Sequence, residues 1–238
     1  MPWPLSRCAS LRLISKDDVP SVASRRPVLI VVAGPNGSGK TSLTTKVLQH
    51  RWIDGCTYIN PDNIARDVYG DWNSNEAVLA AANKAVQMRE HALAHQESIA
   101  FETVLSAPDK LDFIERAKVS GYFVRLFFVG TDNPSINAAR VARRVMEGGH
   151  DVPIPKIISR YSKSIANCII AATLADRSYV YDNSVDGREP KLLFRATEGR
   201  LVKAYQSVNE WARVITENLS REGDVEIVLP TDTTRVRG

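Results

Sequence analysis

A glycine-rich turn that ends in Gly-Lys-Thr carries the clearest chemistry in this sequence. Residues 34–41 run Gly-Pro-Asn-Gly-Ser-Gly-Lys-Thr and match the pattern G-x-x-x-x-G-K-[ST] without a gap. Glycines let backbone N–H groups turn inward around a phosphate, and the helix that follows adds positive potential at its N-terminus. We expect Lys40 to reach the β- and γ-phosphates and the Thr41 hydroxyl to ligate Mg²⁺. The turn therefore predicts a site for a nucleoside triphosphate.

The residues expected to contact this nucleotide come from the turn and from one distant strand end. Those in and just after the turn are Gly34, Pro35, Asn36, Gly37, Ser38, Gly39, Lys40, Thr41 and Ser42. Farther along the chain, "YDNS" ends a predicted strand. There Asp182 and Asn183 can contact the adenine region or can form only an Asx turn. The pattern supports both interpretations equally, and Asn183 is included among the expected nucleotide contacts.

A carboxylate follows the second predicted strand. In "INPDNIARD", Asp62 comes just beyond the strand end, near the expected position of a γ-phosphate. A kinase needs a carboxylate there to accept the proton of the acceptor hydroxyl and to orient the acceptor. The same residue can instead cap a helix over residues 63–69, because aspartate is a common helix cap. The local pattern leaves both roles open.

A second carboxylate ends the third predicted strand, in "FETVLS". Glu102 places a charge where the strand leaves the core, and Thr103 adds a hydroxyl beside it. One interpretation is that these two residues bind the acceptor through hydrogen bonds. The alternative is that Glu102 belongs to the coordination shell of the magnesium ion.

Arginines cluster after the fourth predicted strand, in "NPSINAARVARRVMEGGHDVPIPKIISRYSKS". Arg140, Arg143 and Arg144 lie on one predicted helix at spacings that bring them close together, and Arg160 lies on the next helix. Gly148-Gly149 allow a joint between the two helices. Because guanidinium groups suit transferred phosphoryl oxygens, we predict a helical lid over about residues 133–176, with Arg143, Arg144 and Arg160 in catalytic roles. The alternative is an exposed basic helix.

Short apolar runs rich in β-branched residues alternate with segments of helical periodicity. The predicted strands cover residues 27–34, 56–60, 98–103, 122–130 and 178–183, with a weaker one at 191–196. One predicted helix starts near residue 40, a second runs over about residues 74–95, and a third starts after residue 106. Three more cover residues 133–149, 155–175 and 201–219. This alternation predicts an α/β fold with a parallel sheet of about five strands and helices on both faces. Trp211 and Leu219 are expected in the core.

Length and composition favour one large domain. The chain has 238 residues, 44% of them hydrophobic and 24% charged, which is ordinary globular composition. We assign a flexible arm to residues 1–25, the main domain to 26–220 and a loose tail to 221–238. The net charge of +4 forms no clustered basic face, so we expect no nucleic-acid partner. We expect no membrane span, and the scattered cysteines favour a cytoplasmic location with reduced thiols.

In this order, "AGPNGSGKTS", "INPDNIARD", "FETVLS", "ARVARRVMEGGHDVP" with "ISRYSKS", and "YDNS" resemble the zeta-toxin family of P-loop kinases, in its short chromosomal form. The resemblance covers about residues 27–185. The phosphate turn alone is shared by many families, whereas its combination with Asp62 and the "GGHDVP" joint is much more specific. The resemblance implies a P-loop kinase fold with a helical lid.

The resemblance also implies an activity and a partner. Better-known members of the family are toxins that use ATP and Mg²⁺ to phosphorylate the sugar 3′-hydroxyl of UDP-N-acetylglucosamine. By resemblance, Lys40 and Thr41 hold ATP with Mg²⁺, and Asp62 is the catalytic base. Glu102 and Thr103 bind the sugar-nucleotide acceptor, and the lid arginines cover the phosphates. The expected protein partner is a separate small antitoxin.

Two alternative functions share the phosphate turn. One is a kinase for a nucleoside, an antibiotic or a polynucleotide 5′-end. The other is an ATP-dependent switch or ATPase without an acceptor, which normally carries a hydrophobic strand that ends in an aspartate. The nearest candidate is "FFVGTD", where Asp132 comes late and next to a helix start. The sugar-nucleotide kinase is the leading hypothesis.

Overall fold

The structure is a computed structural model. It describes residues 26–50, 53, 55–70, 74–149, 151–205, 207–220 and 225–227. The predicted arm over residues 1–25 lies outside these ranges, as does most of the predicted tail over residues 221–238.

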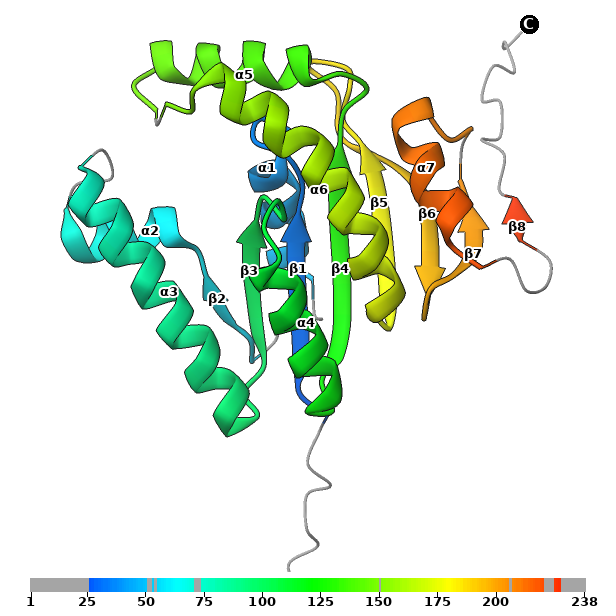
Figure 1. Ribbon diagram of the computed structural model, residues 1–238, viewed down its shortest axis with the longest axis horizontal. Coiled ribbons are helices and arrows are strands. Elements are labelled where there is room, and N and C mark those ends of the chain that lie inside the picture. Colours follow the sequence, from blue (N-terminus) through cyan, green and yellow to red (C-terminus); the bar gives the residue numbers. More distant parts are fainter. Residues whose placement is uncertain are drawn as a thin grey trace, which may run out of the picture.

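Strands and helices alternate along most of the chain (Figure 1). The strands are β1 (Val28–Ala33), β2 (Thr57–Ile59), β3 (Ile99–Thr103), β4 (Phe123–Gly130), β5 (Arg177–Asp182), β6 (Lys191–Thr197), β7 (Arg200–Ala204) and β8 (Glu226–Ile227). The helices are α1 (Lys40–Leu48), α2 (Pro61–Tyr69), α3 (Asn75–His95), α4 (Asp109–Val119), α5 (Pro134–Met146), α6 (Ile154–Leu174) and α7 (Glu210–Asn218).

The strands form one eight-stranded sheet in the order β2-β3-β1-β4-β5-β6-β7-β8. The part from β2 to β5 is parallel throughout, whereas β6 is antiparallel to β5 and β7 is antiparallel to β6. The predicted fold class is confirmed, but the sheet has more than the expected five strands because a β-hairpin extends it beyond β5. The carboxyl ends of the parallel strands therefore meet along one edge, beneath α5 in Figure 1.

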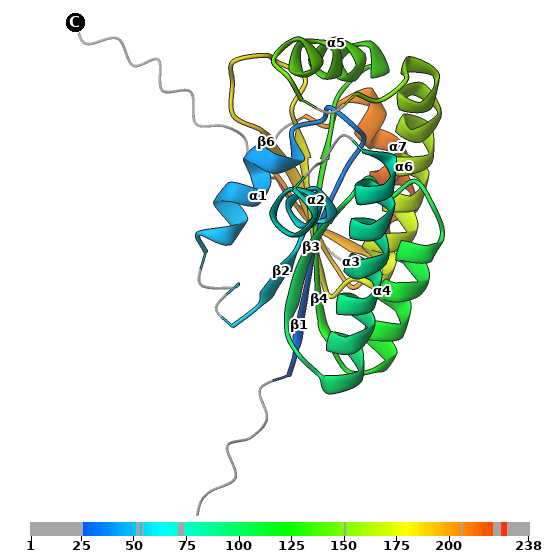
Figure 2. The ribbon, with the colours of Figure 1, turned by 90° about the vertical axis from the view of Figure 1, so that its left-hand side faces the viewer.

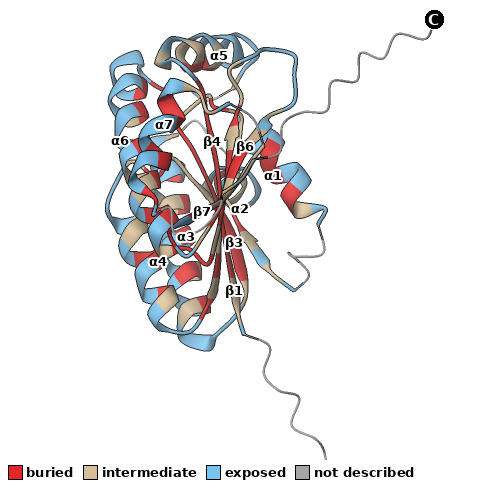
Figure 3. Ribbon diagram, turned by 90° about the vertical axis from the view of Figure 1, so that its right-hand side faces the viewer, coloured by how far each residue is buried: buried red, intermediate tan, exposed pale blue. Residues whose placement is uncertain are grey.

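Helices cover the two faces of the sheet unequally. Figure 2 shows α3, α4, α6 and α7 on one side of the sheet and α1 on the other. Successive residues of β1 point to opposite faces, so Leu29 and Val31 join the larger core while Ile30 and Val32 pack with Leu43 of α1. All of these side chains are buried, as Figure 3 shows for the central strands in general. Because both faces are covered, β1 is a continuous apolar run.

The predicted helix over residues 201–219 is wrong in its first part. Arg200–Ala204 forms strand β7, and the helix covers only Glu210–Asn218. The reason is the turn at Glu198-Gly199, where both residues have positive φ, 49° and 73°. This geometry joins antiparallel strands closely, and pairing with β6 overrides the local helical pattern. The prediction that Trp211 and Leu219 lie in the core is confirmed, with 7% and 4% exposure.

Candidate active site

The phosphate loop connects β1 to α1 and is shaped by its glycines. Gly34, Gly37 and Gly39 have φ values of 152°, 75° and 94°, which side-chain-bearing residues rarely adopt. There is also no room for a side chain at any of the three, and at Gly34 a Cβ atom would lie 2.2 Å from the Val129 carbonyl oxygen. A Cβ atom would lie 2.5 Å from the Asn137 carbonyl oxygen at Gly37 and 2.2 Å from the Asn183 amide nitrogen at Gly39. The loop is thus fixed by its own backbone and by residues from α5 and the end of β5.

The hydroxyl groups around the loop fit a phosphate with its metal ion. Ser38 is fully buried, and its hydroxyl has no hydrogen-bond partner within the described structure. Thr41 and Ser42 are exposed in the first turn of α1, which begins at Lys40 directly after the loop. An orphaned donor at a helix N-terminus suits an anion, and the accessible Thr41 hydroxyl suits a magnesium ion bound to that anion.

Lys40 is the electrostatic centre of the site. Its ammonium donates hydrogen bonds to the Gly34 and Pro35 carbonyl oxygens, at 2.9 Å each. Burial lowers the pKa of Lys40 from 10.5 to about 8, Glu102 and Asp62 act in the opposite direction, and Arg144 and Arg160 lower the pKa further. Two carboxylates and two guanidinium groups from four other segments are therefore within electrostatic reach of this lysine.

Asp62 lies in the first turn of α2, at the carboxyl end of β2. The cap of this helix is Asn60, whose side-chain oxygen accepts a hydrogen bond from the Asp62 backbone N–H at 2.9 Å. Of the two roles that the sequence left open for Asp62, the cap is thus filled by Asn60. The Asp62 carboxylate is exposed and stays available to an acceptor.

Glu102 and Thr103 end strand β3, next to β2. A Glu102 carboxylate oxygen accepts a hydrogen bond from the Tyr58 hydroxyl at 2.6 Å. The Thr103 hydroxyl accepts one from the Leu105 backbone N–H at 3.0 Å, which shapes the loop after the strand. Both residues therefore lie on the same edge of the sheet as Asp62, as the parallel order requires.

The predicted lid arginines separate into two groups. Arg144 of α5 and Arg160 of α6 lie close enough to Lys40 to affect its pKa, and Arg160 donates to the Asn36 side chain at 3.5 Å. Arg140 and Arg143 instead form ion pairs with Asp186 at 2.6 and 3.2 Å. Arg144 and Arg160 are thus the lid arginines whose charges act on Lys40.

The lid helices rest on the loop through a buried asparagine. The Asn137 amide donates to the Asn36 carbonyl oxygen at 2.6 Å, and its oxygen accepts from the Thr131 hydroxyl. A small separate core of Val141, Val152 and Ile157 joins α5 to the start of α6. The second half of α6 packs into the main core. In Figure 1, α5 crosses above the carboxyl ends of the strands.

Asn183 contacts the phosphate loop directly. This contact lies within the protein and does not involve the adenine of a nucleotide. Its amide donates to the Ser38 carbonyl oxygen at 2.9 Å, and its backbone N–H bonds to Gly130. Asp182 accepts from the Ser184 hydroxyl and from the Trp211 indole N–H, at 2.5 and 3.1 Å. Asp182 therefore makes a local turn, whereas Asn183 braces the loop.

Sequence reasoning missed Tyr58, Asn137 and Asp186. Each acts by contacting a residue far away in the chain, so no spacing pattern reveals it. Asn60 had a detectable signal, because an Asn-Pro pair commonly opens a helix. Asp132, the nearest match to a strand-ending aspartate, accepts a hydrogen bond from Asn209 at 2.8 Å.

The phosphate loop after the first strand, the parallel sheet and the charged residues at its carboxyl edge define a P-loop phosphotransferase. The model of the zeta toxin family matches residues 13–184, and the chain therefore belongs to that family. A Haemophilus influenzae protein described as uncharacterized is 30% identical over 132 residues, which are 56% of this chain and 91% of that protein.

Solved structures share the fold. A chain of the AvrRxo1-ORF1:AvrRxo1-ORF2 complex with sulphate ions has a TM-score of 0.58 at 21% identity and covers 84% of this chain. The same complex has been solved with ATP. The match spans just under two thirds, 66%, of the AvrRxo1 chain. The chromosomal toxin–antitoxin system PezAT of Streptococcus pneumoniae gives a TM-score of 0.54 at 15% identity, covering 82% of this chain and 79% of that one.

Family membership and the geometry of the site agree on the reaction type. The chain is an ATP-dependent kinase. Within the described ranges, every helix is too short or too polar to traverse a lipid bilayer.

Proposed function

We propose that this kinase transfers the γ-phosphate of ATP to a hydroxyl of a sugar nucleotide, with UDP-N-acetylglucosamine as the leading acceptor. The observation that carries the proposal is the set of charges that act on Lys40, namely the carboxylates of Glu102 and Asp62 and the guanidinium groups of Arg144 and Arg160. The carboxylates suit an acceptor that must lose a proton, and the guanidinium groups suit the transferred phosphoryl group.

The donor side binds and neutralises the triphosphate. In this proposal the loop N–H groups and Lys40 hold the β- and γ-phosphates, and Thr41 with Ser42 lies beside them at the start of α1. The Thr41 hydroxyl would hold Mg²⁺, which would supply further positive charge at the phosphates. Arg144 and Arg160 stabilise the negative charge on the transferred group, since phosphoryl transfer depends mainly on positioning and electrostatics. Arg143, which pairs with Asp186, contributes less.

The acceptor side orients the hydroxyl and takes its proton. Asp62 is the proposed base, since its carboxylate is exposed at the carboxyl end of β2. Glu102 and Thr103 would hydrogen-bond the sugar, or Glu102 would instead belong to the coordination shell of the magnesium ion. Asn183 supports the nucleotide indirectly, by bracing the loop at Ser38.

The test is a transfer assay with γ-labelled ATP, Mg²⁺ and UDP-N-acetylglucosamine, with a no-acceptor control and the Lys40→Ala protein. We expect label on the sugar nucleotide that is lost with Lys40. Label that appears only as free phosphate would contradict the assignment of a sugar nucleotide as the acceptor and would favour the ATPase alternative. Transfer to a nucleoside, an antibiotic or an oligonucleotide in a parallel screen would favour the other kinase alternative.

The proposal includes a small antitoxin protein as partner and the cytoplasm as the place of action. The structural similarity to a chain from the PezAT toxin–antitoxin system supports the first, and the Cys168 thiol, which forms no disulfide within the described residues, supports the second. We expect growth arrest when the active chain is expressed and none with Asp62→Asn. Equal growth of both strains would remove the toxin part of the proposal without affecting the kinase.

A further inference from the structure

We infer that Tyr58 and Asn60 are positioning residues: together they form a hydrogen-bonded bridge that fixes the proposed base Asp62 relative to Glu102 and to helix α1. This inference rests on the proposed function, because it assigns roles to Asp62 and Glu102 in transfer. Neither Tyr58 nor Asn60 needs to touch the acceptor.

The bridge is a continuous chain of hydrogen bonds. The Asp62 backbone N–H donates to the Asn60 side-chain oxygen at 2.9 Å, and the Asn60 amide donates to the Tyr58 hydroxyl oxygen at 3.0 Å. The Tyr58 hydroxyl in turn donates to the Glu102 carboxylate at 2.6 Å. One asparagine thus uses both ends of its side chain, one to cap α2 and the other to hold Tyr58.

The backbone alone holds this region weakly. Strand β2 has three residues and lies at the edge of the described sheet, where β3 is its partner. An edge strand of this length makes few ladder hydrogen bonds, so its end can shift relative to its neighbour. Asp62 follows β2 by a few residues, and its distance from Glu102 is therefore set by side-chain contacts. The Tyr58–Glu102 hydrogen bond directly links the ends of these two strands.

Tyr58 also faces the donor side. Its ring packs with the smaller core, which contains Leu43 and Val47 of α1, and the Thr44 side chain of the same helix approaches its hydroxyl. Burial raises the pKa of the Tyr58 hydroxyl, and the hydrogen bond to Glu102 raises it further. The hydroxyl therefore stays protonated and keeps donating to the carboxylate. Because α1 also carries Lys40, Tyr58 connects the donor and acceptor halves of the site.

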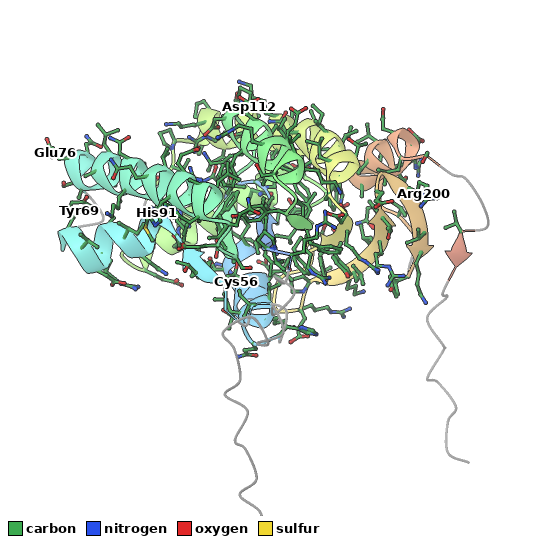
Figure 4. The ribbon with its side chains drawn as sticks, turned by 90° about the horizontal axis from the view of Figure 1, so that it is seen from below. Cys56, Tyr69, Glu76, His91, Asp112 and Arg200 are labelled. Carbon is green, nitrogen blue, oxygen red and sulfur yellow. The ribbon has the colours of Figure 1, made fainter. Side chains whose placement is uncertain are left out.

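The decisive variant is Tyr58→Phe, which removes one oxygen and keeps the ring in the core. We expect kcat for acceptor phosphorylation to fall by about 10- to 100-fold, because small displacements of reacting groups cost that much, while the Kd for ATP stays within about twofold. The matched control is Tyr69→Phe. Tyr69 is 42% exposed at the outer end of α2, near Glu76 and away from Cys56 (Figure 4). The Tyr69→Phe substitution should therefore leave kcat unchanged.

Asn60 separates positioning from helix capping. Asn60→Ser keeps an oxygen that can cap α2 but removes the donor to Tyr58, whereas Asn60→Ala removes both. We expect Asn60→Ser to lower kcat as Tyr58→Phe does, without the loss of thermal stability that Asn60→Ala causes. A normal kcat for Tyr58→Phe and Asn60→Ser would overturn the inference.

Amide hydrogen exchange tests the bridge without an acceptor. We expect the Asp62 amide to exchange several-fold faster in Tyr58→Phe than in the wild type, and as slowly as the wild type in Tyr69→Phe. Unchanged exchange in Tyr58→Phe would also overturn the bridge. If the wild type fails to phosphorylate any sugar nucleotide, the proposed function fails, and the exchange data still decide the bridge.

Discussion

The two halves of the active site are built in different ways. The donor half is contiguous: residues 34–42 form a turn and the start of α1, and nearly every group that would hold the triphosphate lies in it. The acceptor half is dispersed: Asp62 comes from α2, Glu102 from β3, and Tyr58 from β2. A contiguous site leaves a recognisable motif in the sequence, whereas a dispersed site depends on which strands become neighbours.

The halves also differ in what holds them rigid. The phosphate loop is fixed by backbone geometry, since Gly37 and Gly39 pack directly against Asn137 and Asn183. The acceptor half is held by side-chain hydrogen bonds across a short edge strand. We therefore expect substitutions in the donor half to abolish function outright and substitutions in the acceptor half to change transfer more than ATP binding.

The largest effect should come from Lys40→Ala. We expect transfer to fall by about a thousandfold or more, because the positive charge that Lys40 would present to the transferred phosphate is lost. ATP binding should weaken as well. The control is Lys46→Ala on the same helix, where the side chain is 48% exposed and pairs with Glu189. The measurement is labelled-phosphate transfer together with calorimetric ATP binding. Equal losses in both variants would mean that α1 responds to any change of charge.

Asp62→Asn should distinguish the two halves most clearly. We expect kcat to fall by about 10²- to 10⁴-fold, the usual contribution of a general base, with the Kd for ATP nearly unchanged. Asp67→Asn is the matched control, since Asp67 lies on the same helix and pairs with Arg66 at the surface. Transfer at the normal rate by the Asp62→Asn protein would show that another group accepts the proton.

Arg144 and Arg143 are neighbours in sequence that the structure places differently. We expect Arg144→Ala to lower kcat by about 100-fold, as loss of one transition-state donor does, and Arg143→Ala to change it by less than about twofold. The reason is that Arg144 lies near Lys40, whereas Arg143 pairs with Asp186. The comparison uses single-turnover transfer rates. A larger loss for Arg143→Ala would reverse the assignment of the two arginines.

The pH dependence of ATP binding should show a smaller effect. Burial lowers the pKa of Lys40 to about 8 in the free protein, and bound phosphates favour its protonated form. Below pH 8 the lysine is already protonated, so affinity is steady. Above pH 8 binding must take up a proton, and the Kd should rise by up to about tenfold per pH unit. Calorimetry at pH 8.5 in two buffers would show this uptake, and Lys40→Ala should abolish it.

Much of the fold was predictable because its signals are local. Continuous apolar runs such as Val28–Ala33 indicated buried parallel strands, and the structure confirms them. The second strand of the β6–β7 hairpin was missed because residues 201–204 fit a helical pattern until the Glu198-Gly199 turn and the pairing with β6 are known. The roles of the site residues remain predictions.

What the sequence determined by itself is the phosphate loop, its position between a buried strand and a helix, and the family. These features depend on the intrinsic backbone freedom of glycine and on residues close together in the chain. Only the tertiary structure decided that Tyr58 joins Glu102 to the Asn60 cap of α2, and that Arg144 rather than Arg143 lies by Lys40. Those contacts join separate elements, and the packing of the sheet and helices, which no local pattern encodes, sets their distances.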